Sequence, residues 1–295
     1  MINRLAVIGV GLIGGSLALA LKAKGAVNEV IGYSNHEHSR QQALDLGVID
    51  VAADSIAEAV AQADMIFVAV PMGAMASVLN DIAPHLKPGM IITDGGSSKA
   101  QVVDAARQAL ADKISQFVPG HPIAGNEKSG PAAAFASLYD KHRVVLTPLQ
   151  ETDAAATAKV TMMWQVCGAE VHEMTVDDHD TVLAATSHLP HILAFNLVGM
   201  LAERQDCDDV LRYAAGGFRD FSRIASSDAV MWRDICLGNK QAILTLLEQY
   251  QQGLDKLEQA IRENDGDYLM NVFLRAKKAR DTRFADPNLI DKSEV

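Results

Sequence analysis

Residues 5–24 read LAVIGVGLIGGSLALALKAK and hold the pattern that decides the fold. The apolar residues 5–8 suit a buried strand, and the Leu- and Ala-rich run that follows suits a helix. Between them lie Gly9, Gly11 and Gly14 at the spacing of a dinucleotide-binding turn. In such a turn the first glycine permits a tight bend, the second lets the backbone approach a pyrophosphate, and the third lets helix and strand pack closely.

Two other interpretations of this stretch are weaker. The glycine spacing alone is a weak signal, because Gly-rich turns also occur without ligands. The apolar run 5–21 is interrupted by glycines and falls short of the roughly 18–20 residues that a membrane span needs. Strand, turn and helix in this order therefore favour dinucleotide binding, with the N–H groups of Leu12 and Ile13 facing the phosphates and Gly25 ending the helix.

Composition limits the partners and the compartment. At 295 residues the chain has room for two domains, and 49% hydrophobic with 21% charged residues suits a globular protein in water. The net charge of −11 argues against a nucleic-acid partner, and no segment suggests a membrane partner. The three cysteines are widely spaced and form no CxxC motif, which fits a reduced cytoplasmic protein without disulfides or a zinc site.

Short apolar strands alternate with helical segments through the first half of the chain. This alternation predicts an α/β fold with a Rossmann-type, doubly wound, mostly parallel sheet in a dinucleotide-binding domain of residues 1–175. The strands expected after the first lie at residues 29–33, 64–70, 90–93, 117–119, 143–147 and 169–173. Ligands bind at the carboxyl ends of such strands, so we expect Val70 and Pro71 to contact the cofactor and Ser97 to lie nearby.

The end of the second strand bears on the choice between NAD and NADP. An Asp or Glu there would bind the ribose 2′-hydroxyl of NAD, but the position holds Ser34, and Glu29 lies at the wrong end of the strand. Without a carboxylate to repel it, a 2′-phosphate could bind Ser34, Asn35, His36 and Arg40. We therefore favour NADP over NAD. The alternative is that these are ordinary surface residues and that NAD binds without the acid.

The loop 120–130, GHPIAGNEKSG, lies at the same edge of the expected sheet. An imidazole has a pKa near ~6.5, so His121 beside a nicotinamide is suited to take a proton from an alcohol. A lone histidine is more often structural, and only its place at the cofactor edge favours catalysis.

After residue 171 the strand pattern gives way to helices, which predicts an all-helical domain of residues 176–295 for substrate binding and dimerisation. The run 177–180, DDHD, is either a metal cluster or a set of acids that cap and complement a helix start. Its spacing is not that of a metal site, so capping is favoured and no metal is expected.

The segment 187–191, SHLPH, continues a helix in which Pro190 should cause a kink or a local break. His188 and His191 are three residues apart, so they share a helix face and would line a substrate cleft.

The segment 216–224, GGFRDFSRI, holds a candidate anion site. Its glycine pair should break the helix, after which Arg219 and Arg223 lie one turn apart and Asp220 can pair with Arg223. A guanidinium among apolar side chains suits a carboxylate ligand. The alternative is an arginine in a surface salt bridge. A long amphipathic helix is expected at 241–261.

Together these segments resemble the prephenate/arogenate dehydrogenase family of tyrosine biosynthesis, nearly from end to end. Six motifs carry the resemblance: VIGVGLIGGSLA (7–18), TDGGSSK (93–99), GHPIAGNEKSG (120–130), DDHD (177–180), SHLPH (187–191) and GFRDFSRIA (217–225). The resemblance implies NAD(P)-dependent oxidative decarboxylation of a cyclohexadienyl alcohol that carries a ring carboxylate. The aromatic product would be 4-hydroxyphenylpyruvate or tyrosine.

The resemblance also implies roles for single residues. His121 looks like the hydrogen-bond acceptor for the ring hydroxyl, with Ser97 holding both the hydroxyl and the imidazole. Arg223 looks like the ligand of the ring carboxylate, oriented by Asp220. The other implied substrate contacts are Ser187, His191, Asn126, Glu127 and Trp232.

Substrate choice and regulation are implied less sharply. A histidine in the place of His191 accompanies prephenate use in the family, whereas Asn126 stands where many relatives have Thr. Prephenate is therefore expected as a substrate, and arogenate stays open. No added regulatory domain is expected, so any tyrosine inhibition would act in the active site, and dimerisation is expected through the helices.

Two alternatives remain at this stage. Another two-domain hydroxyacid dehydrogenase would need a catalytic lysine in the helical domain, and none lies near 187–191 or 217–225. A non-catalytic NADPH-sensing protein would not need His121, Ser97 and Arg223 together.

Overall fold

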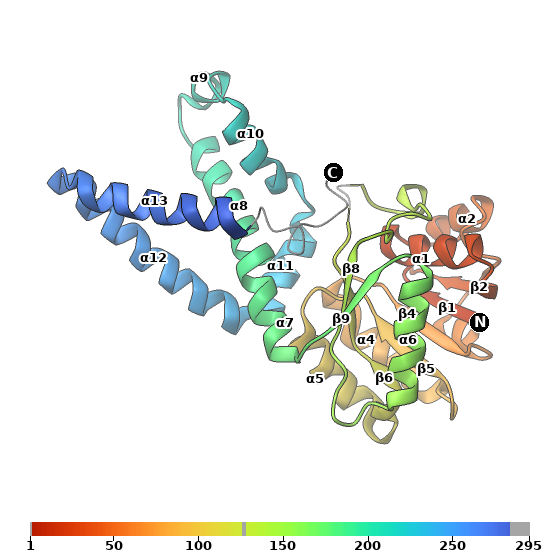
Figure 1. Cartoon of the computed structure of the whole chain (residues 1–295). Coiled ribbons are helices and arrows are strands. Elements are labelled where there is room, and N and C mark those ends of the chain that lie inside the picture. The colour runs from red at the N-terminus through yellow and green to blue at the C-terminus, as the bar shows by residue number, and fades with distance from the viewer. Residues whose placement is uncertain (1, 126–127, 284–295) are drawn as a thin grey trace.

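The computed structural model describes residues 2–125 and 128–283. Figure 1 shows a sheet-containing half, built from the first part of the chain, beside a helical half. The main sheet has six strands, all parallel, in the order β3-β2-β1-β4-β5-β6. Its strands are β1 (Ile2–Ile8), β2 (Val27–Tyr33), β3 (Val51–Ala52), β4 (Met65–Val68), β5 (Ile91–Asp94) and β6 (Phe117–Val118). This arrangement confirms the expected Rossmann-type fold.

Helices cover both faces of this sheet, because its central strands are apolar on both sides. In β1, Leu5 and Val7 join one hydrophobic core while Ala6 and Ile8 join the other. The helices around the sheet are α1 (Leu12–Ala23), α2 (Glu37–Asp45), α3 (Ile56–Val60), α4 (Met75–Ile82), α5 (Lys99–Leu110) and α6 (Ala154–Val166), with short 3-10 turns η1 (Met72–Ala74), η2 (Ala83–His85), η3 (Ala111–Gln116) and η4 (Pro131–Ala133).

A second, three-stranded sheet was not foreseen from the sequence. It consists of β7 (Gly120–Pro122), β8 (Arg143–Leu146) and β9 (Glu170–Glu173), with β7 antiparallel to β8. The chain leaves the main sheet after Val118 and enters the second sheet at Gly120. Pro119 between them has no N–H to offer a neighbouring strand, and its carbonyl accepts from the Thr147 N–H at 2.9 Å.

The helical half begins with one long, continuous helical run. The run consists of α7 (Val176–Leu183), a five-residue π-helix η5 (Ala184–His188) and α8 (Leu189–Ala202). The elements after it are α9 (Cys207–Arg212), α10 (Gly216–Ser222), η6 (Arg223–Ser226), α11 (Ala229–Gly238), α12 (Lys240–Glu263) and α13 (Gly266–Arg283). Figure 1 shows α12 and α13 as an arm that extends away from the sheets.

Two expectations about breaks in this half need correction. The chain is not broken at Gly216 and Gly217, which start α10; the non-helical residues are Tyr213, Ala214 and Ala215. Pro190 does not end the helical run. Because proline cannot donate an intrahelical hydrogen bond, the turn before it widens into the π-helix that ends at His188.

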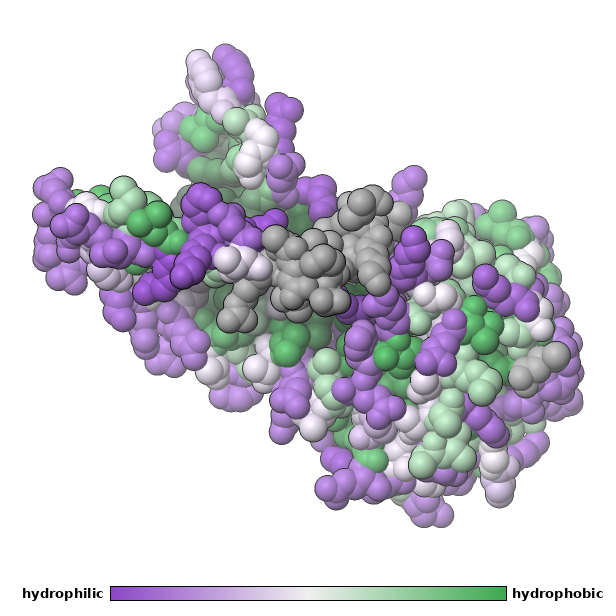
Figure 2. All heavy atoms as spheres, viewed as in Figure 1, coloured by the Kyte–Doolittle hydropathy of each residue, from purple (hydrophilic) through white to green (hydrophobic). Residues whose placement is uncertain are grey.

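Apolar surface is concentrated in the helical half. By length and composition alone, the run 176–202 is long and apolar enough to cross a membrane. Of its apolar window, 22% is buried inside the protein. Figure 2 shows hydrophobic surface among these helices. Large exposed apolar side chains there include Met200, Leu237, Leu254 and Phe273.

Candidate active site

The glycine turn between β1 and α1 fits a dinucleotide. Gly9 has φ +100°, and a Cβ there would overlap the carbonyl of Ala69, whereas a Cβ on Gly14 would overlap the carbonyl of Gly9. A Cβ on Gly11 would meet nothing within 4 Å. Gly11 therefore borders open space at the start of α1, whose first turn carries no acidic side chain. Phosphates can approach free N–H groups there.

A cation lies at the carboxyl end of β2, and the strand itself ends without an acidic residue. Ser34 follows the last strand residue, and Arg40 from α2 donates to the Ser34 carbonyl at 2.7 Å. Asp54 lies 3.6 Å from the same guanidinium and is largely exposed. Glu29, the acidic residue of this strand, pairs instead with Arg4 at the opposite end. Glu29 and Ser34 therefore lie at the two ends of β2 that the sequence predicts for them.

The other expected cofactor residues follow the same edge. Leu12 and Ile13 open α1, and Pro71 precedes η1 directly after Val70. Asn35 and His36 are exposed before α2. The described residues that are expected to bind the cofactor therefore follow β1, β2 and β4, and their contact with a cofactor stays a prediction.

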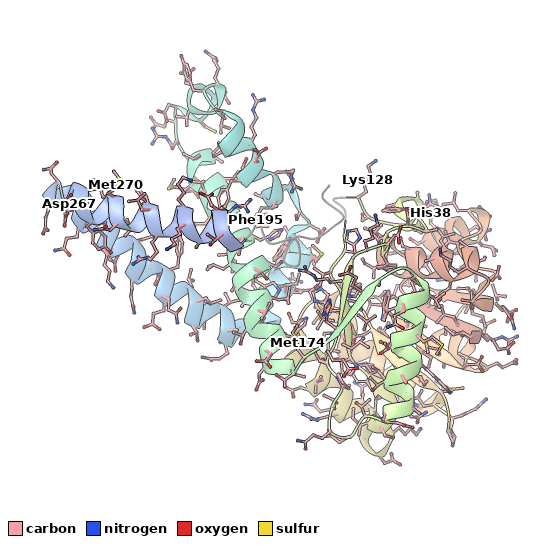
Figure 3. All side chains as sticks on the ribbon, viewed as in Figure 1. His38, Lys128, Met174, Phe195, Asp267 and Met270 are labelled. Carbon is pink, nitrogen blue, oxygen red and sulfur yellow. The ribbon has the colours of Figure 1, made fainter. Side chains whose placement is uncertain are left out.

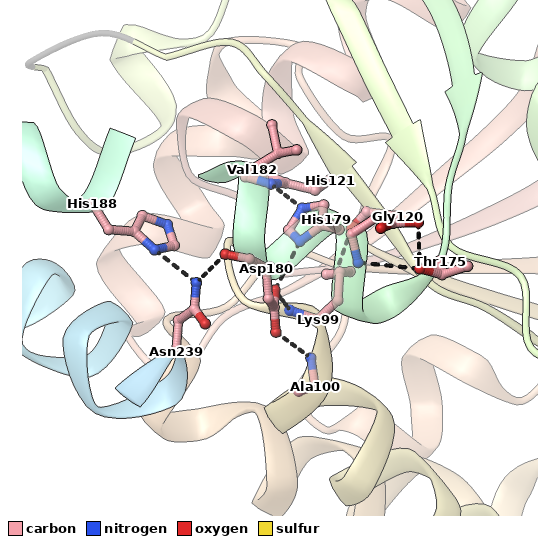
Figure 4. Close-up of polar contacts among 12 residues, drawn as sticks. Lys99, Ala100, Gly120, His121, Thr175, His179, Asp180, Val182, His188 and Asn239 are labelled. Carbon is pink, nitrogen blue, oxygen red and sulfur yellow. Dashed lines mark hydrogen bonds and ion pairs between the residues drawn. The ribbon is translucent and has the colours of Figure 1, made fainter. Parts of the chain in front are cut away.

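A chain of three side chains extends from β7 into the helical half (Figure 4). His121 Nδ1 lies 2.9 Å from His179 Nε2, and His179 Nδ1 lies 2.8 Å from Asp180 Oδ1. The Asp180 carboxylate in turn accepts the N–H groups of Lys99 at 2.8 Å and Ala100 at 2.9 Å, at the start of α5. All three side chains are buried. The imidazole from one half is thus held by a histidine and an acid from the other.

The hydrogen bonds fix where the protons lie. An ionised carboxylate only accepts, so His179 Nδ1–H donates to Asp180 and His179 Nε2 accepts from His121 Nδ1–H. His121 Nε2 is left as the acceptor. Burial lowers the pKa of His121 well below its ordinary value, and the charges of His179 and Lys99 add to this effect. Burial raises the pKa of Asp180, but its hydrogen bonds outweigh that and hold the pKa below its usual range.

The DDHD run is partly as expected: Asp177 and Asp178 lie in the first turn of α7 and complement the helix start, but they do not supply its cap. Its own helix α7 is capped by Thr175, whose Oγ1 accepts the Asp178 N–H at 3.1 Å. Asp180 instead caps α5, which lies 80 residues earlier in the chain. Sequence reasoning missed His179 and Asp180 because local spacing does not show which distant helix an acid will cap. The described residues contain no group of three His, Cys, Asp or Glu side chains that could hold a metal.

His188 is an internal residue and does not line a cleft as expected. It is 1% exposed, and its Nδ1 accepts from Asn239 Nδ2 at 3.1 Å. Asn239 also donates to the backbone carbonyl of Asp180 at 2.7 Å. Burial lowers the pKa of His188 to about 4, so the ring is neutral. Through Asn239, His188 links the π-helix η5 to the junction of α11 and α12 and to the backbone of Asp180.

His191 is half-buried and held on two sides. Its Nδ1 donates to the Ser187 carbonyl at 2.8 Å, and its ring stacks on Trp232 from α11. Burial, helped by the charge of Arg223, lowers the pKa of His191. Arg223 begins η6, which packs against α8, the helix that carries His191.

The remaining expected site residues that the structure describes lie in the loop after β5 and in α10 and η6. Ser97 is half-buried in the loop between β5 and α5, and within the described chain its hydroxyl makes no hydrogen bond. Arg223 opens η6, and Asp220 is exposed on α10. Asn126 and Glu127 lie outside the described residues. Figure 3 shows Met174 at the junction of the two halves, between β9 and α7.

Comparison with known proteins gives a consistent result. Residues 17–173 match the family described as prephenate dehydrogenase, nucleotide-binding domain, and residues 175–275 match its dimerization domain. The chain is 41% identical to the cyclohexadienyl dehydrogenase of Zymomonas mobilis over 94% of its length and 95% of the relative's. It is 40% identical to the prephenate dehydrogenase of Bacillus subtilis, covering 92% of this chain and 74% of that one. A solved structure of prephenate dehydrogenase from A. aeolicus, in complex with hydroxyphenyl propionate and NAD+, superposes with a TM-score of 0.86 at 34% identity, covering 94% and 98% of the two chains.

Proposed function

Since the chain belongs to the prephenate dehydrogenase family of NAD(P)-dependent oxidoreductases, we propose that it oxidises and decarboxylates prephenate with NADP as the preferred acceptor, and that arogenate is a second substrate. The nicotinamide supplies a hydride acceptor when bound. The chain's own residues bind it, hold the substrate and take the hydroxyl proton. The one observation that carries this proposal is the hydrogen-bonded chain from His121 to His179 and Asp180.

His121 is the proposed base. Its Nε2 accepts the proton of the ring hydroxyl while the hydride leaves the same carbon. Its Nδ1–H then moves toward His179, where Asp180 stabilises the positive charge. A positioned base of this kind contributes about 10²–10⁴-fold to the rate, and the neutral state of His121 keeps it ready to accept.

Arg223 is the proposed ligand of the ring carboxylate. A guanidinium binds a carboxylate through two parallel N–H···O bonds, which would hold the ring flat over the nicotinamide. His191, in the same neighbourhood, is the proposed contact for the substrate side chain, with Ser187 and Trp232 holding its ring. Ser97, in the loop that follows β5, is suited to bind the ring hydroxyl beside His121.

The preference for NADP rests on Arg40. Its guanidinium lies at the carboxyl end of β2, where an NAD site has an acid, and it is bound to the backbone beside Ser34. A 2′-phosphate there would find a cation and no fixed carboxylate other than the exposed Asp54.

We also propose a homodimer formed through the helical half. The match of residues 175–275 to a dimerization domain and the exposed apolar side chains of α8, α11, α12 and α13 support this assembly. Tyrosine, which resembles the product, would inhibit by occupying the site of Arg223 and His191.

The test is a direct assay. Purified protein with prephenate and NADP should form reduced cofactor, detected by its absorbance, and 4-hydroxyphenylpyruvate. His121→Asn should keep cofactor affinity but lower kcat at least about 100-fold, whereas the exposed control His85→Asn should not change kcat. Near-normal turnover by His121→Asn would remove this residue from the mechanism.

A further inference from the structure

A fully buried ion pair lies directly behind the proposed base. Asp94 ends β5 and Lys99 starts α5, both are 0% exposed, and Lys99 Nζ lies 2.5 Å from Asp94 Oδ2. No step of the proposed reaction uses either charge. Burial of an ion costs on the order of several kcal/mol, and apolar residues of the same volume are often at least as stabilising. Stability alone is therefore a weak reason for this pair.

The pair binds both backbone groups of one residue. The Gly120 N–H donates to Asp94 Oδ1 at 3.0 Å, and the Gly120 carbonyl accepts from Lys99 Nζ at 2.6 Å. Gly120 lies where the chain passes from the six-stranded sheet to the three-stranded one. Its carbonyl belongs to the planar peptide that leads into His121. The ion pair thus sets the orientation of the backbone that carries the imidazole.

Asp94 is held as an acceptor by several donors. Besides the Gly120 N–H and the ammonium of Lys99, its Oδ2 accepts the Gly96 N–H at 2.7 Å. A carboxylate surrounded by three donors is ionised, since a protonated acid would bring a donor of its own. The ammonium of Lys99 is then its counter-charge.

Lys99 also acts on the far end of the hydrogen-bonded chain. Its backbone N–H binds Asp180, so one residue contacts both the peptide before His121 and the acid that orients His179. The charge of Lys99 opposes protonation of both imidazoles, because like charges repel in a site of low dielectric constant. The charged and titratable groups packed around His121 are Asp94, Lys99, His179, Asp180 and His188.

We propose that Lys99 and Asp94 are positioning residues, which fix the backbone at Gly120 and keep His121 neutral until it accepts the substrate proton. The proposal rests on the role assigned to His121. It assigns to the buried pair a kinetic function that a merely structural ion pair would not have.

Lys99→Met tests this proposal because it keeps the length of the side chain and removes the charge. We expect kcat to fall at least about 30-fold while the Kd for NADP and the KM for prephenate stay within about threefold. The acid limb of the kcat profile should move to higher pH by about one unit, because loss of a nearby cation raises the pKa of His121. Unchanged kcat and an unchanged profile in the folded variant would overturn the proposal.

Two further variants make the outcome unambiguous. Lys113→Met is the matched control, since Lys113 Nζ also donates to a backbone carbonyl, that of Ala83 at 2.9 Å, and it should leave both quantities unchanged. If Lys99→Met does not fold, Lys99→Arg decides. It retains the charge, so the profile should stay in place, but its larger head displaces Gly120 and should lower kcat; wild-type kcat would contradict the proposal. Full activity of His121→Asn would instead show that the proposed function itself is wrong.

Discussion

His191 stacks on Trp232, with ring centroids 3.6 Å apart and ring planes 19° apart. The Nδ1–H of the same imidazole is fixed on the Ser187 carbonyl, so Nε2 is the nitrogen left for a ligand. In the neutral ring Nε2 accepts a hydrogen bond, and in the protonated ring it donates one. The ammonium of arogenate suits the first form, and the keto acid of prephenate suits the second.

Substrate preference should therefore depend on pH. Burial lowers the pKa of His191 from its ordinary 6.5, so its ring is neutral at about pH 7. We expect the ratio of kcat/KM for arogenate to that for prephenate to rise as the pH is raised toward about 6.5 and to stay constant above it. The measurement is steady-state kinetics with both substrates at several pH values. His191→Asn, whose amide does not titrate, should abolish the change, and a ratio independent of pH in the wild-type enzyme would contradict the assignment.

The acid behind the base should be needed for turnover. Asp180→Asn removes the charge that stabilises a protonated His179, and we expect kcat to fall about 100-fold with little change in the Kd for NADP. The variant should also unfold more easily, because the two carboxylate oxygens of Asp180 accept the N–H groups of Lys99 and Ala100, and an amide has one acceptor oxygen, so one buried N–H loses its partner at a cost of about 1–3 kcal/mol. Asp178→Asn is the control, since Asp178 is exposed on the same helix and binds Thr175. Equal kcat in the two variants would refute the role of Asp180.

Cofactor preference should reverse with two substitutions. Arg40→Ala removes the cation at the end of β2, and we expect the KM for NADP to rise about tenfold or more while that for NAD stays within about threefold. Ser34→Asp should add to this effect by repelling a 2′-phosphate and binding a ribose 2′-hydroxyl. Arg107→Ala, which removes an exposed arginine paired with Glu151, is the control. An unchanged NADP/NAD ratio in Arg40→Ala would show that another group reads the phosphate.

Acid should destabilise the fold through His188. Its pKa is about 4 in the folded protein against an ordinary value of 6.5. The unfolded chain therefore binds the proton more tightly, and stability falls as the pH drops below about 6.5. For this one group the loss reaches about 3 kcal/mol near pH 4. Urea unfolding at a series of pH values should show it, and His188→Gln should unfold with a shallower dependence on pH.

Most of the sheet half could be predicted from the sequence, because its signals are local. The glycines of the turn, the Ser55 cap on α3, whose Oγ accepts the Glu58 N–H at 3.1 Å, and the Gly25 helix end at φ +59° each depend on a few neighbouring residues. The three-stranded sheet could not be predicted in this way, since β7, β8 and β9 look like any other strands, and only tertiary packing decides which sheet they join.

The same difference between local signals and long-range packing applies to the residues of the site. His121 was singled out from a local feature, its place just after the apolar strand 117–119, although the structure places it inside β7 of the second sheet and not in a loop. His179 and Asp180 were missed because their partners, His121 and the start of α5, lie 58 and 80 residues away. The pairing of Lys99 with Gly120 was missed for the same reason, as nothing in TDGGSSK shows that its lysine is buried.

The uninterrupted helical run from Val176 to Ala202 has a mechanical consequence. One helical run carries His179 and Asp180 in its first turns, the proposed substrate contacts Ser187 and His191 near its middle, and the exposed Met200 near its far end. If the proposed dimer packs against that end, a shift of the run there would also move His179 and Asp180, so we expect dilution below the dimer dissociation constant to lower kcat.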